Sequence, residues 1–201
     1  MKTIFKTPSA QICVNVLYKE VPSILLSTYQ NKNKFDSLCQ IGCTNFERKW
    51  SCPPYSPSYT DFTSKYEKIL VLLLFAELWQ FSYIKNDYLK IKAANSIMKS
   101  RVDKSLRLHL SDDSYYISTG SCRMCKPCKC KLHLPCAHPD KMSYSFEALG
   151  IDVSQMLLDI FDFKLQWYNK GKLPQYTSVV AGLLFNNCLD LQGFLNTSLL
   201  I

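Results

Sequence analysis

Five cysteines close together in the middle of the chain are the residues best suited to chemistry. They lie within fifteen residues and are interleaved with prolines and basic side chains: Cys122, Cys125, Cys128, Cys130 and Cys136. Such a segment cannot pack as a regular helix or strand, so something other than apolar burial must order it. Thiolates are soft ligands, and two cysteines separated by two residues can reach one metal ion from a single turn. The segment therefore predicts a metal site.

The spacing of this run first suggests an iron–sulfur cluster. Two residues lie between Cys122 and Cys125 and two between Cys125 and Cys128, and Cys136 follows. Such spacing wraps three corners of an iron–sulfur cube from one loop and takes the fourth ligand from nearby. The match to a bacterial ferredoxin run is partial, because Pro135 here precedes the fourth cysteine instead of following it.

Zinc is the alternative metal for the same segment. Cys125, Cys128, His133 and His138 form a second set of four ligands at finger-like spacing. Zinc accepts both sulfur and imidazole ligands, so this set is chemically acceptable. The sequence therefore predicts a metal here and leaves iron–sulfur and zinc open.

A second cysteine group lies nearer the start of the chain. It consists of Cys39, Cys43 and Cys52, the last followed by two prolines. Gly42 would permit a sharp turn that lets Cys39 and Cys43 face one point. We interpret these thiols as a second preformed ligand group, and the alternative is three ordinary buried cysteines.

Composition and length bound the class of protein. With 201 residues, 47% of them apolar, the chain fits a single cysteine-rich metal-binding domain over residues 1–201. The start lacks the sustained apolar stretch of a signal peptide, and the apolar run at 69–76 is far shorter than the ~20 residues of a membrane span. We therefore expect a cytoplasmic protein without a membrane partner, in which clustered cysteines bind metal rather than form disulfides.

The net charge of +8 admits an anionic partner but does not demand one. The basic residues are spread along the chain, and several stand among the thiols whose negative charge they would balance. Nucleic acid is therefore not excluded and not favoured. No Ser-His-Asp set, phosphate-binding glycine loop or dinucleotide fingerprint is present.

Hydrophobic periodicity predicts an α+β fold. Strands are expected over 11–18, 69–75, 115–119, 165–168 and 177–185, and helices over 23–29, 58–68, 87–110, 143–149 and 152–161. The run at 69–75 is apolar throughout, which is typical of a buried central strand. The order of elements favours one largely antiparallel sheet flanked by helices, with two cysteine-rich metal-binding loops. Cys13 is expected in the core of the first strand.

Several short motifs occur in an order that resembles a known family. They are Arg48-Lys-Trp50-Ser-Cys52-Pro-Pro, Gly120-Ser-Cys122-x2-Cys125-x2-Cys128, Pro135-Cys136-x2-Pro139 and Glu147-x2-Gly150-Ile-Asp-Val153. The chain is similar, from about residue 39 to 187, to a prokaryotic family of unknown function usually labelled predicted metal-binding protein. The resemblance implies seven ligands: Cys39, Cys43, Cys52, Cys122, Cys125, Cys128 and Cys136. The additional Cys130 leaves two candidates for one ligand position.

Seven ligands suit a four-plus-three arrangement, in which a three-thiol cluster leaves one iron open to bind a substrate oxygen or sulfur. The sequence offers no accompanying acid–base pair, so whether the protein is an enzyme stays undecided. The first hypothesis is a [4Fe–4S] protein of electron transfer or of sulfur or metal handling, with a redox partner protein. The alternative is a zinc-stabilised module that binds a nucleic-acid or protein partner.

Overall fold

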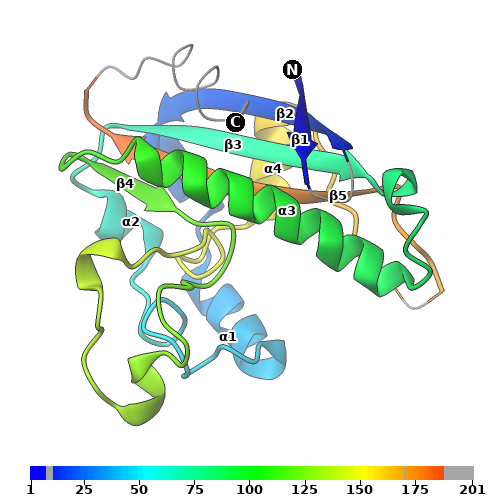
Figure 1. Cartoon of the computed structure of the whole chain (residues 1–201). Coiled ribbons are helices and arrows are strands. Elements are labelled where there is room, and N and C mark those ends of the chain that lie inside the picture. Colours follow the sequence, from blue (N-terminus) through cyan, green and yellow to red (C-terminus); the bar gives the residue numbers. More distant parts are fainter. Residues whose placement is uncertain (8–10, 170, 188–201) are drawn as a thin grey trace.

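A five-stranded antiparallel sheet forms the centre of the computed structural model, which describes residues 1–7, 11–169 and 171–187. Its strands are β1 (Lys2–Lys6), β2 (Gln11–Pro22), β3 (Lys68–Glu77), β4 (Ser114–Ile117) and β5 (Tyr176–Phe185). They are arranged in the order β1-β2-β3-β5-β4, and every neighbouring pair is antiparallel (Figure 1). The predicted α+β class and antiparallel sheet are therefore confirmed.

Strand β3 is the central strand because its sequence has no polar residue between its ends. Ile69 to Leu74 are fully buried, and the strand pairs with β2 on one side and β5 on the other. A strand covered on both faces must be apolar on both faces, which explains the continuous run rather than an alternating one. The predicted central strand at 69–75 is confirmed.

Helices cover the two faces of the sheet. The long helix α3 (Asp87–Leu108) runs along one face and buries Ala94, Met98 and Val102, which recur at helical spacing (Figure 1). The opposite face carries η1 (Ser23–Tyr29), α2 (Tyr59–Thr63) and α4 (Val153–Phe161). Short helices η2 (Leu78–Phe81), η3 (Lys129–Leu132) and η4 (Pro139–Lys141) lie in connections. Among the described residues, no helix combines the length and apolar content that a membrane crossing needs.

Helix α1 (Lys32–Gly42) was not predicted, and it lies away from the sheet beside the two cysteine-bearing loops (Figure 1). It is short and has no buried residue, so it is held by its cap and by contacts at its start rather than by an apolar face packed on the sheet. Asn31 caps it by accepting a hydrogen bond from the Lys34 amide. Strand β1 was also missed, because it is a short strand at the sheet edge.

Several local predictions were wrong. The helix expected over 58–68 ends at Thr63, and Lys68 already begins β3. Residues 143–149 form turns rather than a helix, because the Tyr144 carbonyl accepts the Ser118 amide and ties this segment to the end of β4. Residues 165–168 belong to no strand. Cys13 is exposed on β2, where its backbone hydrogen-bonds with the Gln80 side chain, so it is not a core residue.

Gly150 fixes the start of α1 against the main body. Its carbonyl accepts the Asn31 amide at 2.7 Å, and its φ is +88°, a conformation that favours glycine. A Cβ at this position would lie 2.7 Å from the Lys32 Cα, which is backbone and cannot rotate away. This close approach holds the helix that carries Cys39.

We therefore expect Gly150→Ala to destabilise the protein by about 1–3 kcal/mol, because it adds a clash and a strained φ. Chemical denaturation followed by circular dichroism measures the change. The matched control is Gly42→Ala. Gly42 is the last residue of α1, and a Cβ there would meet nothing within 4 Å. That control should be neutral or stabilising by up to about 1 kcal/mol. Equal destabilisation by both substitutions would contradict this account of Gly150.

Candidate metal centre

The end of α1 presents the first two cysteines of the earlier group. Cys39 lies in the last turn of the helix, and Cys43 is its C-cap residue, with its amide donating to the Cys39 carbonyl at 2.9 Å. Residues four apart on a helix lie on one face, so the helix itself brings the two thiols together. Gly42 lies inside the helix and does not have a positive φ, so the predicted glycine turn is wrong.

Cys52 completes this group from a tight turn in the following loop. The Cys52 carbonyl accepts the amides of Tyr55 and Ser56, which folds the chain back immediately after the cysteine. Burial raises the pKa of the Cys52 thiol to about 11, and the neighbouring Cys43 and Cys39 thiols also raise it. Burial and then Cys43 likewise raise the pKa of Cys39. The three thiols therefore act on one another electrostatically, and a metal ion binding them would displace protons.

The later group encloses a small cavity. The cavity is lined by four of the five clustered cysteines and by side chains from three neighbouring segments: Trp50, Ser51, Cys122, Met124, Cys125, Cys128, Cys136, His138 and Met142. The four cysteines are those whose spacing matched an iron–sulfur loop. The fifth, Cys130, is buried outside the cavity and donates from its Sγ to the Glu47 carbonyl at 3.6 Å.

Backbone N–H groups point at two of the sulfurs. The amide of Lys129 donates to Cys125, and the amides of Cys130 and Trp50 donate to Cys128. Burial pushes the pKa of Cys128 upward, but these amides and the Cys125 thiol outweigh it and lower that pKa below its ordinary value. Hydrogen bonds of this kind stabilise thiolates and tune metal centres that thiolates hold.

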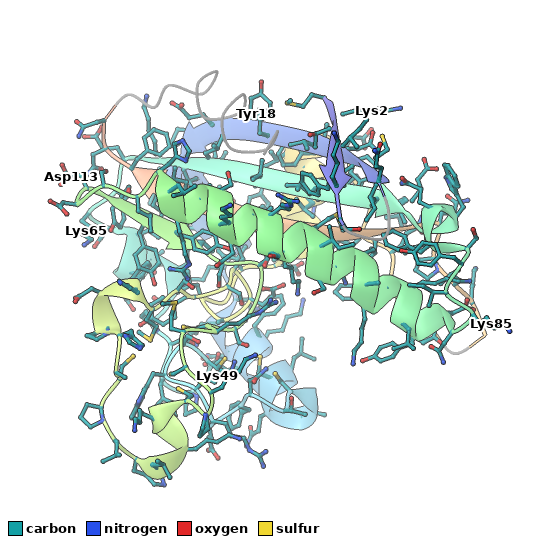
Figure 2. All side chains as sticks on the ribbon, in the orientation of Figure 1. Lys2, Tyr18, Lys49, Lys65, Lys85 and Asp113 are labelled. Atoms are coloured by element: carbon teal, nitrogen blue, oxygen red, sulfur yellow. The ribbon has the colours of Figure 1, made fainter. Side chains whose placement is uncertain are left out.

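The two cysteine-bearing loops pack directly against each other. The Lys49 ammonium donates to the Ser121 hydroxyl at 2.9 Å and to the Cys122 carbonyl at 2.8 Å, and it lies among these loops in Figure 2. Ser51 accepts the Cys122 amide at 3.1 Å, and the Trp50 indole donates to the Leu134 carbonyl. The segment 49–51 therefore joins the two cysteine groups. Analysis of the sequence did not assign this role, although the segment belongs to one of the motifs that carried the family resemblance.

The two histidines considered as zinc ligands differ in their placement. His138 lines the cavity, whereas His133 is exposed, ends η3 and is not part of the lining. Over residues 1–7, 11–169 and 171–187, no three histidine, cysteine, aspartate or glutamate side chains converge closely enough to hold a metal ion as they stand. The nine cysteines of these segments are free thiols. Cys125 and Cys128 hydrogen-bond to each other, so their two thiols are close neighbours.

The chain was compared with families, curated proteins and solved structures. A family model described as "Predicted metal-binding protein (DUF2284)" matches residues 23–185. The chain belongs to this family. The matched region begins at η1 and ends with β5, so it contains both cysteine groups and most of the sheet. No curated protein and no solved structure matched the chain.

Membership in the predicted metal-binding family agrees with the donor set. Sulfur donors clustered on turns, amides aimed at sulfur and cationic side chains beside them are what thiolate-bound metals need. The carboxylates of Asp36 and Glu147 act on the first group: after burial and the Cys43 thiol, the charge of Asp36 and then that of Glu147 raise the pKa of Cys39. Asp152 is the N-cap residue of α4 and pairs with Lys34 at 3.2 Å.

Proposed function

We propose that this protein binds an iron–sulfur cluster of the [4Fe–4S] type through Cys122, Cys125, Cys128 and Cys136. One observation carries the proposal: the four cysteines that match the iron–sulfur spacing line one cavity, and the additional Cys130 does not. Cubane clusters are held by four cysteine thiolates, three of them commonly from one loop. The amides on Cys125 and Cys128 supply the hydrogen bonds to sulfur that adjust a cluster's potential.

The first group adds a second part to the proposal. Cys39, Cys43 and Cys52 would hold a second cluster with three protein ligands, which leaves one iron position for a substrate or a non-protein ligand. Contacts of the segment 49–51 with the later loop support a functional connection between the two groups. The protein would then act in electron transfer or in sulfur or metal handling, with a redox protein as partner.

Metal analysis of protein purified under anaerobic conditions tests the proposal. We expect a brown protein whose iron matches its acid-labile sulfide, with broad absorption in the visible region. An iron content near eight per chain indicates two clusters of the [4Fe–4S] type, and a content near four indicates one. A colourless protein with stoichiometric zinc and no sulfide would contradict the proposal and favour the zinc-stabilised module.

Zinc is a second candidate because His138 lines the cavity together with the cysteines. Zinc accepts three cysteines and one histidine in structural sites. The paired replacement His133→Ala and His138→Ala separates the two metals. Loss of bound metal in that variant would favour zinc, whereas retained iron and sulfide would agree with a cluster held by cysteine alone.

A further inference from the structure

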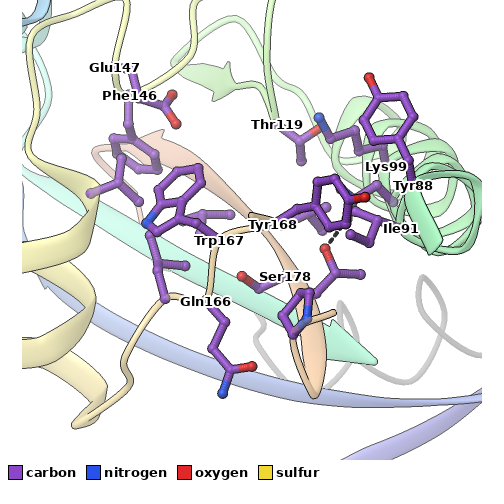
Figure 3. A pocket seen from close by; sticks show the side chains of 17 residues that line it. Tyr88, Ile91, Lys99, Thr119, Phe146, Glu147, Gln166, Trp167, Tyr168 and Ser178 are labelled. Atoms are coloured by element: carbon purple, nitrogen blue, oxygen red, sulfur yellow. Dashed lines mark hydrogen bonds between the residues drawn. The ribbon is translucent and has the colours of Figure 1, made fainter. Parts of the chain in front are cut away.

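A cleft opens where the outer strand of the sheet stops early. Strand β4 pairs only with Gly182 to Phe185, so no strand among the described residues pairs with the first half of β5 on its outer side. A cleft of about 410 Å³ lies along this half, between α3 and the segment 146–168. This volume lies within the range of small-molecule sites. On its floor the Thr177 hydroxyl donates to the Asn95 amide oxygen at 2.9 Å, drawn as a dashed line in Figure 3.

Aromatic side chains form much of the wall of this cleft, which we call the aromatic cleft. Tyr88, Phe146, Trp167 and Tyr168 line it, and Figure 3 shows Trp167 lying between Phe146 and Tyr168. Trp167 lies in a segment that is neither helix nor strand. Its side chain is 71% exposed although it lines a concave site. A large exposed ring on the wall of a cleft offers a flat surface on which a planar ligand can stack.

A second cleft of about 300 Å³ shares Lys99 and Thr119 with the first. Four cationic side chains and a single carboxylate line this basic cleft: Lys99, Lys104, Arg107, Arg123 and Asp103. Asp103 is already paired with Arg107 at 3.1 Å. Three cations of the basic cleft therefore have no acidic partner in its wall, which is the condition for binding an anion.

Lys99 stands at the junction of the two clefts. Its ammonium lies over Gly120, and its side chain is half-buried, yet it makes no hydrogen bond or ion pair with any described residue. Burial and the nearby Arg123 lower the pKa of Lys99, and Glu147 opposes them. Holding two cations near each other in a partly dehydrated cleft is unfavourable unless an anion joins them. Glu147 balances part of this charge without forming a salt bridge with Lys99, and an anionic ligand between Lys99 and Arg123 would balance the rest.

Both clefts adjoin the cysteine groups. Cys122 and Met124 line both the basic cleft and the cysteine cavity, so the two spaces are adjacent. Glu147 lines the aromatic cleft and acts electrostatically on Cys39 of the first group. A molecule in the joined clefts would therefore lie next to the candidate metal centre.

We propose that the joined clefts bind a small organic anion, with its charged group between Lys99 and Arg123 and its planar ring against Trp167. The binding site itself is inferred from the two clefts and their side chains alone. Its role as the substrate site of a metal centre rests on the function proposed above. The ligand class is a ring compound that carries a carboxylate or a phosphate, because guanidinium and ammonium groups bind both.

Calorimetric titration of the purified full chain with four probes tests this inference. Phenyl phosphate and benzoate carry both a ring and an anionic group, whereas inorganic phosphate carries only the charge and benzyl alcohol only the ring. We expect one of the two ring anions to bind about tenfold or more tightly than inorganic phosphate and benzyl alcohol. The preferred ring anion identifies whether the charged group is a phosphate or a carboxylate.

Two substitutions locate the binding. Lys99→Met and Trp167→Ala should each weaken the preferred ring anion about tenfold. Their matched controls are Lys85→Met, an exposed lysine outside both clefts, and Trp79→Ala, whose ring is 70% exposed and therefore comparable with Trp167. Both controls should bind as the unchanged protein does. Circular dichroism and denaturation confirm that each variant is folded.

The outcome of the titration with ring anions does not depend on the outcome of the metal assay. No measurable binding of either ring anion, or equal weakening by the test and control substitutions, would overturn the inference even if iron and sulfide are present. Binding that depends on Lys99 and Trp167 would support the ligand site even in a protein without a cluster, and in that case only the proposed function would fail.

Discussion

Replacing Cys125 by serine should remove most of the bound iron and sulfide and abolish the visible absorption. Cys125 lines the cavity with Cys122, Cys128 and Cys136, and its thiol hydrogen-bonds Cys128. A serine hydroxyl is a hard, weakly acidic ligand that does not replace a thiolate on iron. The loop is held mainly by turns, and of its five cysteines only Cys130 is buried, so losing one ligand leaves little to keep the others in place. Iron and sulfide analysis of anaerobically purified protein measures the effect.

The matched control is Cys130→Ser in the same loop. Cys130 is buried outside the cavity, and the hydrogen bond from its side chain to the Glu47 carbonyl is one that serine can also donate. Its backbone amide, which points at the Cys128 sulfur, is unchanged by the substitution. We therefore expect nearly full iron and sulfide in this variant. Iron lost from Cys130→Ser but kept in Cys125→Ser would reverse the ligand assignment.

Much of the sheet could be predicted because its strands obey simple patterns. The run from Ile69 to Phe75 is apolar on both faces, and a strand buried on both sides requires this. The long helix α3 was found from its periodic apolar residues, and the helix predicted over 152–161 forms as α4, with Asp152 as its N-cap. In each case the physical signal is local, so neighbouring residues in the sequence are sufficient to reveal it.

The position of the first cysteine group could not be predicted in the same way. Helix α1 has an exposed surface and is held by Gly150, which is more than a hundred residues away in the sequence. Spacing suggested that Cys39 and Cys43 share a turn, whereas a helical turn brings them together. The expected glycine turn was wrong, because Gly42 lies inside the helix without a positive φ.

Local sequence patterns also could not predict the contacts between the two loops. Lys49 and Ser51 hold the backbone of Cys122, more than seventy residues along the chain. Nothing in the spacing of either cysteine group encodes this pairing. The same limitation applies to Lys99, because nothing in the sequence around it marks a cleft. The structure places it at the junction of the two clefts.

The double substitution Cys39→Ser and Cys43→Ser should remove about half of the iron and sulfide. Two of the three ligands of the first group are lost, while the four cysteines around the later cavity are untouched. The remaining protein should keep the visible absorption of one cluster. This partial loss differs from the effect of Cys125→Ser, so the two variants together tell which cysteine group holds which metal.

The control for this variant is Ile41→Ser, on the same turn of α1. Ile41 is 84% exposed, so its replacement introduces the same hydroxyl into the same helix end without removing a ligand or a core contact. Iron and sulfide should be unchanged in it. If the double cysteine variant also retains all of its iron, the first group holds no cluster, and an open iron position cannot come from Cys39, Cys43 and Cys52. If it loses all of its iron, the two groups bind metal cooperatively, as the contacts of Lys49 and Ser51 with Cys122 would allow.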